Sequence, residues 1–181
     1  YGYQCENSSY GTWRINDNSL RVYGDVRPQA EMLPRDLSGE YVQRSTSHNP
    51  LFHFTLEALT QPLQLDSLRF RLRGDFGSSA LQRLSLYASQ DAVLDAGDEE
   101  LAAMESVTAA GDFLYDTVNY SLQAQQPMHM FLGATISATA DSGKWMQVDT
   151  LFARDLIFAD TTAIRGADTL PSSDTITIIP Q

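Results

Sequence analysis

Cysteine and positive charge are both scarce in this sequence. Cys5 is the only cysteine among 181 residues, so no internal disulfide can cross-link the fold, and its thiol either stays unpaired or bridges to another chain. Twelve Lys and Arg residues stand against 23 Asp and Glu residues, which leaves a formal net charge of -11. Because so acidic a chain repels phosphate groups, the composition argues against nucleic acid as a partner.

Long apolar runs and helical patterns are also missing. No apolar run approaches the roughly 18 to 20 residues that span a bilayer, and no basic amphipathic stretch is present to lie on a membrane surface. These absences argue against membrane insertion. The best helix candidate is residues 98–104, where the early carboxylates would suit a helix N-terminus.

What the sequence does contain is a period-two alternation of apolar and polar residues, which places alternate side chains on one face of a β-strand. Leu68, Phe70 and Leu72 alternate with arginines, which predicts a strand with a buried apolar face and a basic outer face. The same alternation occurs at Phe52, Phe54 and Leu56, at Leu84 and Leu86, at Met128, Met130, Leu132, Ala134 and Ile136, at Leu156 and Phe158, and at Ile176 and Ile178.

Clusters of Gly, Asp, Pro and Ser separate these segments, for example at residues 74–79, 141–143 and 170–174, as turns do. Many short strands joined by turns predict an all-β fold, namely an antiparallel β-sandwich of the jelly-roll or Ig-like type. We expect one sandwich domain over residues 19–181, preceded by an extended, polar N-terminal arm over residues 1–18.

Four segments carry a resemblance to a known module: residues 49–59, 62–74, 81–87 and 130–143. Together with an Asp-Ala-Gly-Asp loop end at residues 95–98 and an Ala-Asp-Ser-Gly element at residues 140–143, their pattern resembles the N-terminal accessory domain of BNR-repeat neuraminidases. Related β-sandwich modules occur in bacterial surface proteins. The resemblance covers roughly residues 49–181.

The resemblance implies a secreted or cell-surface protein of a bacterium or archaeon, with a calcium-tolerant sandwich in an accessory, adhesive or assembly role. It does not imply neuraminidase activity, because the Ser-x-Asp-x-Gly-x-x-Trp repeats of a sialidase propeller are absent. A Gly-x-Ser-x-Gly nucleophile elbow is absent as well. We therefore expect a protein that is not an enzyme.

The densest set of possible ligands follows the strand predicted at Leu84 and Leu86. Five carboxylates, those of Asp91, Asp95, Asp98, Glu99 and Glu100, lie within ten positions. Because Ca²⁺ takes roughly six to eight oxygen ligands, the first four of these predict a calcium site. The loop is shorter than in related surface modules, and Val93 occupies the place of a ligand or glycine. The alternative is a solvated acidic turn.

His48, His53 and His129 are the only histidines, and none has a partner at the sequence spacing of a transition-metal site. His53 and His129 each alternate with apolar residues. We therefore expect both on the outer faces of strands and predict no transition-metal site.

Several short motifs have both a functional and a plain structural explanation. Arg73, Gly74 and Asp75 spell the integrin-binding tripeptide, although a turn at the end of a strand explains them fully. Asn7 and Asn119 begin N-glycosylation sequons. Four N-terminal aromatic residues would either stack on sugars or pack on a neighbour: Tyr1, Tyr3, Tyr10 and Trp13.

The C-terminal run of Thr175, Ile176, Thr177, Ile178 and Ile179 is a strong β-former. A terminal strand either completes its own sheet or adds to the edge of a neighbouring molecule. With the resemblance, this strand leads to the hypothesis of a non-catalytic structural protein whose copies form a filament, sheath or S-layer-like array by strand exchange. The alternative hypothesis is a carbohydrate-binding accessory module of a glycan-active enzyme, which predicts an aromatic platform on the surface.

Overall fold

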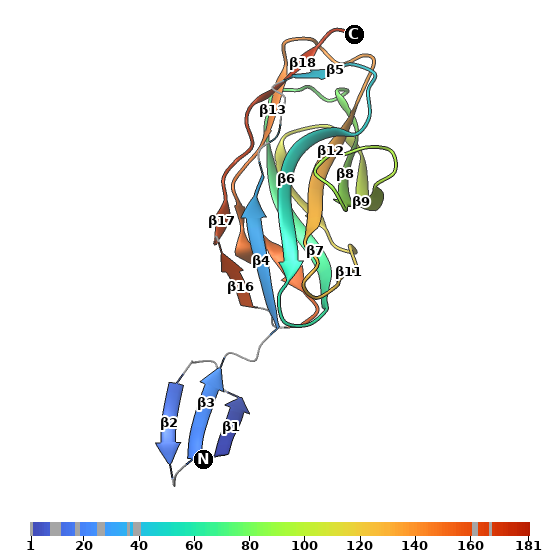
Figure 1. The fold of residues 1–181 in the computed structure, drawn as a ribbon. Coiled ribbons are helices and arrows are strands. Elements are labelled where there is room, and N and C mark those ends of the chain that lie inside the picture. The colour runs from blue at the N-terminus through green and yellow to red at the C-terminus, as the bar shows by residue number, and fades with distance from the viewer. Residues whose placement is uncertain are drawn as a thin grey trace.

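The computed structural model describes residues 2–7, 12–16, 19–24, 28–35, 37, 41–160, 163–166 and 168–181 (Figure 1). These residues form strands and a single 3-10 turn, η1 (Ala153–Asp155), and no α-helix is found among them. The predicted all-β class is therefore confirmed. None of the described segments forms a helix with the length and apolar character of a membrane span.

One layer of the fold is a six-stranded sheet, here called the β6 sheet after its central strand. Its order is β16 (Ala163–Gly166), β4 (Gln29–Pro34), β6 (Asn49–Ala58), β12 (Met128–Ile136), β8 (Leu81–Ser89) and β9 (Glu99–Val107). Every neighbouring pair is antiparallel except β16 with β4.

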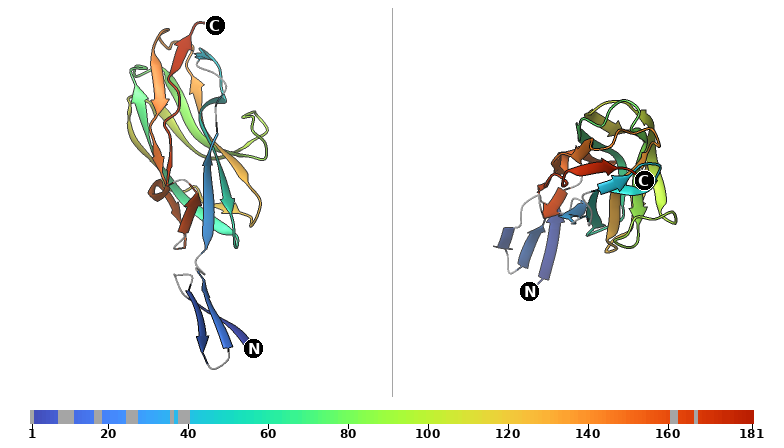
Figure 2. Two further views of the ribbon diagram at one scale, coloured as in Figure 1. Left: turned by 60° about the vertical axis from the view of Figure 1, so that its left-hand side comes forward. Right: turned by 90° about the horizontal axis from the view of Figure 1, so that it is seen from above.

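The other layer is a seven-stranded sheet, here called the β7 sheet. Its path runs β10 (Gly111–Tyr115), β7 (Leu63–Gly74), β13 (Trp145–Val148), β18 (Ile176–Ile179) and β5 (Tyr41–Gln43), and β11 (Tyr120–Leu122) and β15 (Leu156–Phe158) also pair with β7. A small pair, β14 (Leu151–Phe152) and β17 (Thr169–Leu170), lies beside it. Figure 2 shows the two layers from the side and from above.

The core lies between the two sheets and follows the predicted alternation. Leu68, Phe70 and Leu72 of β7 are buried, whereas the arginines between and beside them are exposed. Residues from both sheets join in one hydrophobic cluster. The hydroxyl of Tyr115 in the β7 sheet donates a hydrogen bond to the carbonyl oxygen of Leu84 in the β6 sheet at 2.8 Å, so this buried polar group is satisfied across the core.

The outer face of the β6 sheet is covered as well. Phe131 and Tyr87 are 1% and 5% exposed, although both lie outside the main cluster. A Cβ atom on Gly133 would lie 2.8 Å from Leu94 and 2.9 Å from Tyr87. Glycine at this position therefore lets the loop after β8 lay Leu94 against the sheet, and the same loop carries the acidic stretch.

The helix predicted at residues 98–104 is wrong. These residues belong almost entirely to strand β9, which pairs with β8 and places Ala102 opposite Leu86 and Met104 opposite Leu84. A helix of two turns is marginal by itself, whereas pairing with β8 satisfies the backbone and packs both apolar side chains on the core.

The N-terminal residues differ from the predicted arm. Strands β1 (Gly2–Asn7), β3 (Ser19–Gly24) and β2 (Thr12–Asn16) form a sheet of their own, with β1 parallel and β2 antiparallel to β3. In the described part of the chain, β3 pairs with neither sandwich sheet. The domain boundary predicted between residues 18 and 19 therefore falls inside this small sheet, and the first sandwich strand is β4.

Candidate functional site

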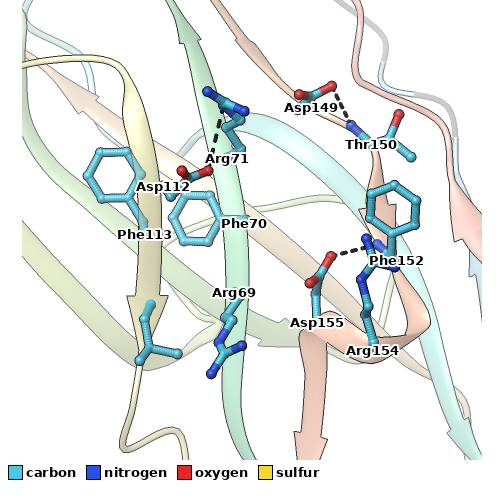
Figure 3. Close-up of a pocket in the computed structure, with 11 residues that line it drawn as sticks. Arg69, Phe70, Arg71, Asp112, Phe113, Asp149, Thr150, Phe152, Arg154 and Asp155 are labelled. Carbon is cyan, nitrogen blue, oxygen red and sulfur yellow. Dashed lines mark hydrogen bonds and ion pairs between the residues drawn. The ribbon is translucent and has the colours of Figure 1, made fainter.

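The outer face of the β7 sheet contains a hollow of about 450 Å³ (Figure 3). Strand β7 supplies its floor, because the alternation that buries Phe70 turns Arg69 and Arg71 outward. Asp112 and Leu114 come from β10, where they pair in register with Arg71 and Arg69. The opposite wall is the segment that runs from Asp149 through Thr150, Phe152, Arg154 and Asp155.

Carboxylates and guanidinium groups alternate across this hollow. Arg71 lies 3.6 Å from Asp112 in an exposed ion pair. Arg73 donates from Nε to Asp149 at 2.8 Å, and Asp149 also accepts from the Thr150 amide at 2.9 Å. Burial acts to raise the pKa of Asp149, but these hydrogen bonds outweigh it and hold the pKa below its usual value. Arg69 makes no ion pair with any described residue.

Three phenylalanines line the hollow, Phe70, Phe113 and Phe152, and Phe152 lies on the wall opposite β10. The guanidinium carbon of Arg154 lies 4.3 Å from the centre of its ring, a cation–π contact. Asp155 accepts a hydrogen bond from the Phe152 amide at 2.9 Å, which fixes the backbone at the start of η1. Leu114, 42% exposed, adds an apolar surface on the other side.

The lining of the hollow combines balanced charge with apolar surface. Three arginines and three aspartates line it, so its formal charge is zero although the chain as a whole carries -11. Its lining contains no histidine, serine or cysteine, so the side chains there that can act as general base or nucleophile are the three aspartates and Thr150. It offers guanidinium donors and carboxylate acceptors beside a phenyl ring and an exposed leucine.

Sequence reasoning found only part of this hollow. The basic outer face of β7 was predicted from the alternation, but the acidic and aromatic side chains come from β10 and from residues 149–155. They meet β7 only through strand pairing, and no local motif marks them.

Three of the predicted calcium ligands, Asp91, Asp95 and Asp98, lie in one loop, where their carboxylate oxygens accept hydrogen bonds from backbone amides. Asp91 Oδ1 accepts from the Val93 amide at 2.9 Å, and Asp95 Oδ1 accepts from the Gly97 amide at 2.7 Å. Asp98 Oδ2 accepts from the Asp95 amide at 2.7 Å. Among the described residues, no group of three His, Cys, Asp or Glu side chains is placed to hold a metal ion. Calcium binding here stays a prediction.

Glu99 and Glu100 begin β9, outside these loop hydrogen bonds. Glu99 lines the same surface depression as Asp91, Asp95 and Asp98. Glu100 forms an ion pair with Arg83, and this partner lowers the pKa of its carboxyl group. Three of the five carboxylates therefore accept hydrogen bonds within the loop, and the other two belong to strand β9.

The two histidines expected on outer strand faces come together. His53 Nε2 lies 2.8 Å from His129 Nδ1, and the His53 ring stacks on Phe131 with 4.1 Å between centres. His53 pairs in register with Phe131 on the outer face of the β6 sheet, as expected, but it is buried there at 4% exposure because this face is covered. Two ligands do not complete a transition-metal site.

The integrin-like tripeptide has a structural role. Gly74 has φ +148°, and a Cβ atom there would lie 2.3 Å from the carbonyl oxygen of Trp145. Asp75 accepts from Lys144 at 2.9 Å, and Arg73 is engaged by Asp149. Glycine is thus required where β7 leaves the sheet, and both charged neighbours are paired.

The predicted assembly strand is paired within its own chain. Strand β18 covers four of its five residues and lies between β13 and β5. Ile176 and Ile178 are buried in the core, at 2% and 0% exposure, while Thr175 is exposed just before the strand.

The two glycosylation candidates differ in what the structure describes. Asn119 is exposed, with φ 49°, immediately before β11. Asn7 ends β1, and only its backbone is described, as is true of Cys5, Tyr3 and Trp13 in the same sheet. Tyr1 and Tyr10 lie outside the described residues.

Comparisons with known proteins do not assign the chain to a family. No protein-family model matches it, and no curated protein matches it. One similar solved structure is that of AvmM, described as catalysing macrocyclization in alchivemycin A biosynthesis. It shares 9% sequence identity, the alignment covers 94% of this chain and 96% of that chain, and the TM-score is 0.30. At that TM-score the likeness carries no argument about fold or function.

The loop hydrogen bonds predict different effects for two substitutions of Asp95. Asp95→Asn keeps an oxygen that accepts from the Gly97 amide, whereas Asp95→Ala removes it and lowers the free energy of unfolding by about 1 kcal/mol. Thermal melting of both variants checks this, and equal destabilisation by both would contradict it.

Melting with calcium and with chelator tests the calcium prediction, because a bound ion raises the melting temperature.

The histidine pair predicts acid sensitivity. Burial, and then the charge of Arg35, lower the pKa of His129 below 6.5, and the charge of Asp91 opposes them. The unfolded chain therefore binds a proton first, so stability is complete above about pH 6.5 and falls as the pH drops through the folded-state pKa. His129→Asn should lose less stability than wild type between neutral and mildly acidic pH, as measured by denaturant unfolding. If the stability of the variant and of the wild type fell equally over this pH range, His129 would not be the source of the acid sensitivity.

Proposed function

We propose that this chain is a non-catalytic, extracellular module that binds glycans through the hollow on the β7 sheet. The observation that carries the proposal is the balanced set of three arginines and three aspartates around Phe152 and Leu114. A sugar ring presents hydroxyl groups, which both donate and accept hydrogen bonds, and an apolar C–H surface. This hollow offers partners for all three.

The charge balance favours an uncharged sugar over an ion. An anion would gain from Arg69 and Arg71 but would be repelled by Asp112 and Asp155, and a cation would meet the reverse. Hydroxyl groups have no such conflict, because guanidinium donates to them and carboxylate accepts from them. Leu114 and the ring of Phe152 supply apolar contact.

A second candidate function is the self-assembling surface subunit, and the observation that favours it is the position of β18 between two short strands, β13 and β5. Two residue pairs join β18 to β13 and three join it to β5, and backbone hydrogen bonds of Ile178 with Gly143 and Lys144, and of Ile179 with Arg44, extend this pairing. Because a second copy would offer the same residue pairs and hydrogen bonds, exchange of this strand between copies would keep its contacts. The predicted partner is then the chain itself.

Sedimentation tests this second function. If the terminal strand exchanges, wild-type protein forms concentration-dependent oligomers, and removal of residues 175–181 abolishes them. A synthetic peptide of residues 174–181 then restores a folded monomer, because it fills the vacant place between β13 and β5. Wild-type protein that stays monomeric at high concentration would exclude assembly by strand exchange.

Glycan binding is tested by calorimetric titration with neutral hexose and N-acetylhexosamine oligosaccharides. Asp112→Asn and Arg71→Gln each remove one charged hydrogen-bonding group from an exposed pair, so both fold normally and weaken binding by about tenfold. Arg83→Gln is the matched control, because Arg83 pairs with Glu100 and Glu105 on the other sheet. Absence of binding, or equal loss in the control, would overturn the proposal.

A further inference from the structure

A row of exposed side chains crosses the β7 sheet near the C-terminus. Trp145 of β13 pairs with Thr177 of β18, and Thr177 pairs with Tyr41 of β5. Residues paired in this way point to the same face of a sheet. The neighbouring residues Val42, Ile178 and Met146 are buried in the core, so the row lies on the outer face.

The two aromatic residues of this row are among the few exposed large hydrophobic residues of the described chain. Tyr41 is 61% exposed and Trp145 is 37% exposed. They are separated by two inter-strand spacings, or about 9.5 Å, with the half-buried Thr177 between them. Two aromatic side chains on either side of a hydroxyl form the surface aromatic platform that a carbohydrate-binding module is expected to have.

The row lies on the same face as the hollow. Along β13 the outward positions are Trp145 and Gln147, and Asp149 follows them at the edge of the hollow. Four residues of extended chain span about 13 Å. Between the two ends lies Gln147, which pairs with Arg73 of β7. The face is therefore continuous from the aromatic row to the hollow.

We infer that Tyr41, Thr177 and Trp145 form a second subsite, and that the ligand is an extended, uncharged glycan chain that spans both subsites. This inference rests on the proposed glycan-binding function and deepens it. The polar hollow holds one sugar unit by its hydroxyl groups, and the aromatic row supports units farther along the chain by contact with their apolar surfaces. A single terminal sugar would leave the aromatic row unused.

The test is titration with neutral oligosaccharides of increasing length, from the monosaccharide upward. Affinity of the wild-type protein rises with length until the chain spans both subsites, and Tyr41→Ala removes most of the rise, about tenfold for the longest oligosaccharide. Because Tyr41 is mostly exposed, this variant folds normally. Val93→Ala is the matched control, since Val93 is 63% exposed on a loop away from this face. Trp145→Ala, checked by melting temperature, gives an independent second variant.

The outcomes separate this inference from the function on which it rests. Affinity that depends on Asp112 and Arg71 but not on chain length or on Tyr41 would overturn the second subsite and keep the hollow. Binding of uronate oligosaccharides in place of neutral ones would overturn the uncharged ligand. Failure of every oligosaccharide to bind would overturn the proposed function itself.

Discussion

The backbone pairing of β7 is the constraint on which the rest of the structure depends. This strand of 12 residues pairs with β10 and β11 on one side and with β13 and β15 on the other. Its register therefore sets the position of four other strands. A slip by one residue would turn its leucines to solvent and its arginines into the core, at the cost of burying unpaired charge. The arginine floor of the hollow is thus a by-product of the alternation that makes the core.

The charged groups on the surface contribute little to the stability of the fold. Arg83 with Glu100 and Glu105, and Arg71 with Asp112, are exposed ion pairs, and such pairs contribute about 0 to 1 kcal/mol each. Burial of a single core side chain contributes more, roughly 1.5 to 3 kcal/mol. Because the charges on the hollow add little to folding, they are free to be arranged for a ligand. In the acidic loop, the contact with the β6 sheet is likewise apolar, because Leu94 packs beside Gly133.

The fold was more predictable from the sequence than the site. Period-two alternation is local, so it predicted the strands at Leu68 and Met128 and the all-β class. The helix prediction at residues 98–104 rested on an acidic start, which suits a helix N-terminus, and it was wrong because pairing with β8 decides the structure. The hollow needs Arg71, Asp112 and Asp149 from three segments, and the row needs Tyr41, Trp145 and Thr177 from three more. Their proximity arises from strand order, which no single stretch of sequence records.

Strand β18 connects the two candidate functions. It contributes Ile176 and Ile178 to the core and Thr177 to the middle of the aromatic row. If a second copy supplied this strand, pairing in the same register would rebuild the row from two chains, with Trp145 and Tyr41 on one and Thr177 on the other. Strand exchange would therefore preserve the glycan-binding face. A bound glycan that contacts all three side chains would in turn bridge β13, β18 and β5 and add to the contacts that hold β18, so that ligand binding would slow exchange of the strand.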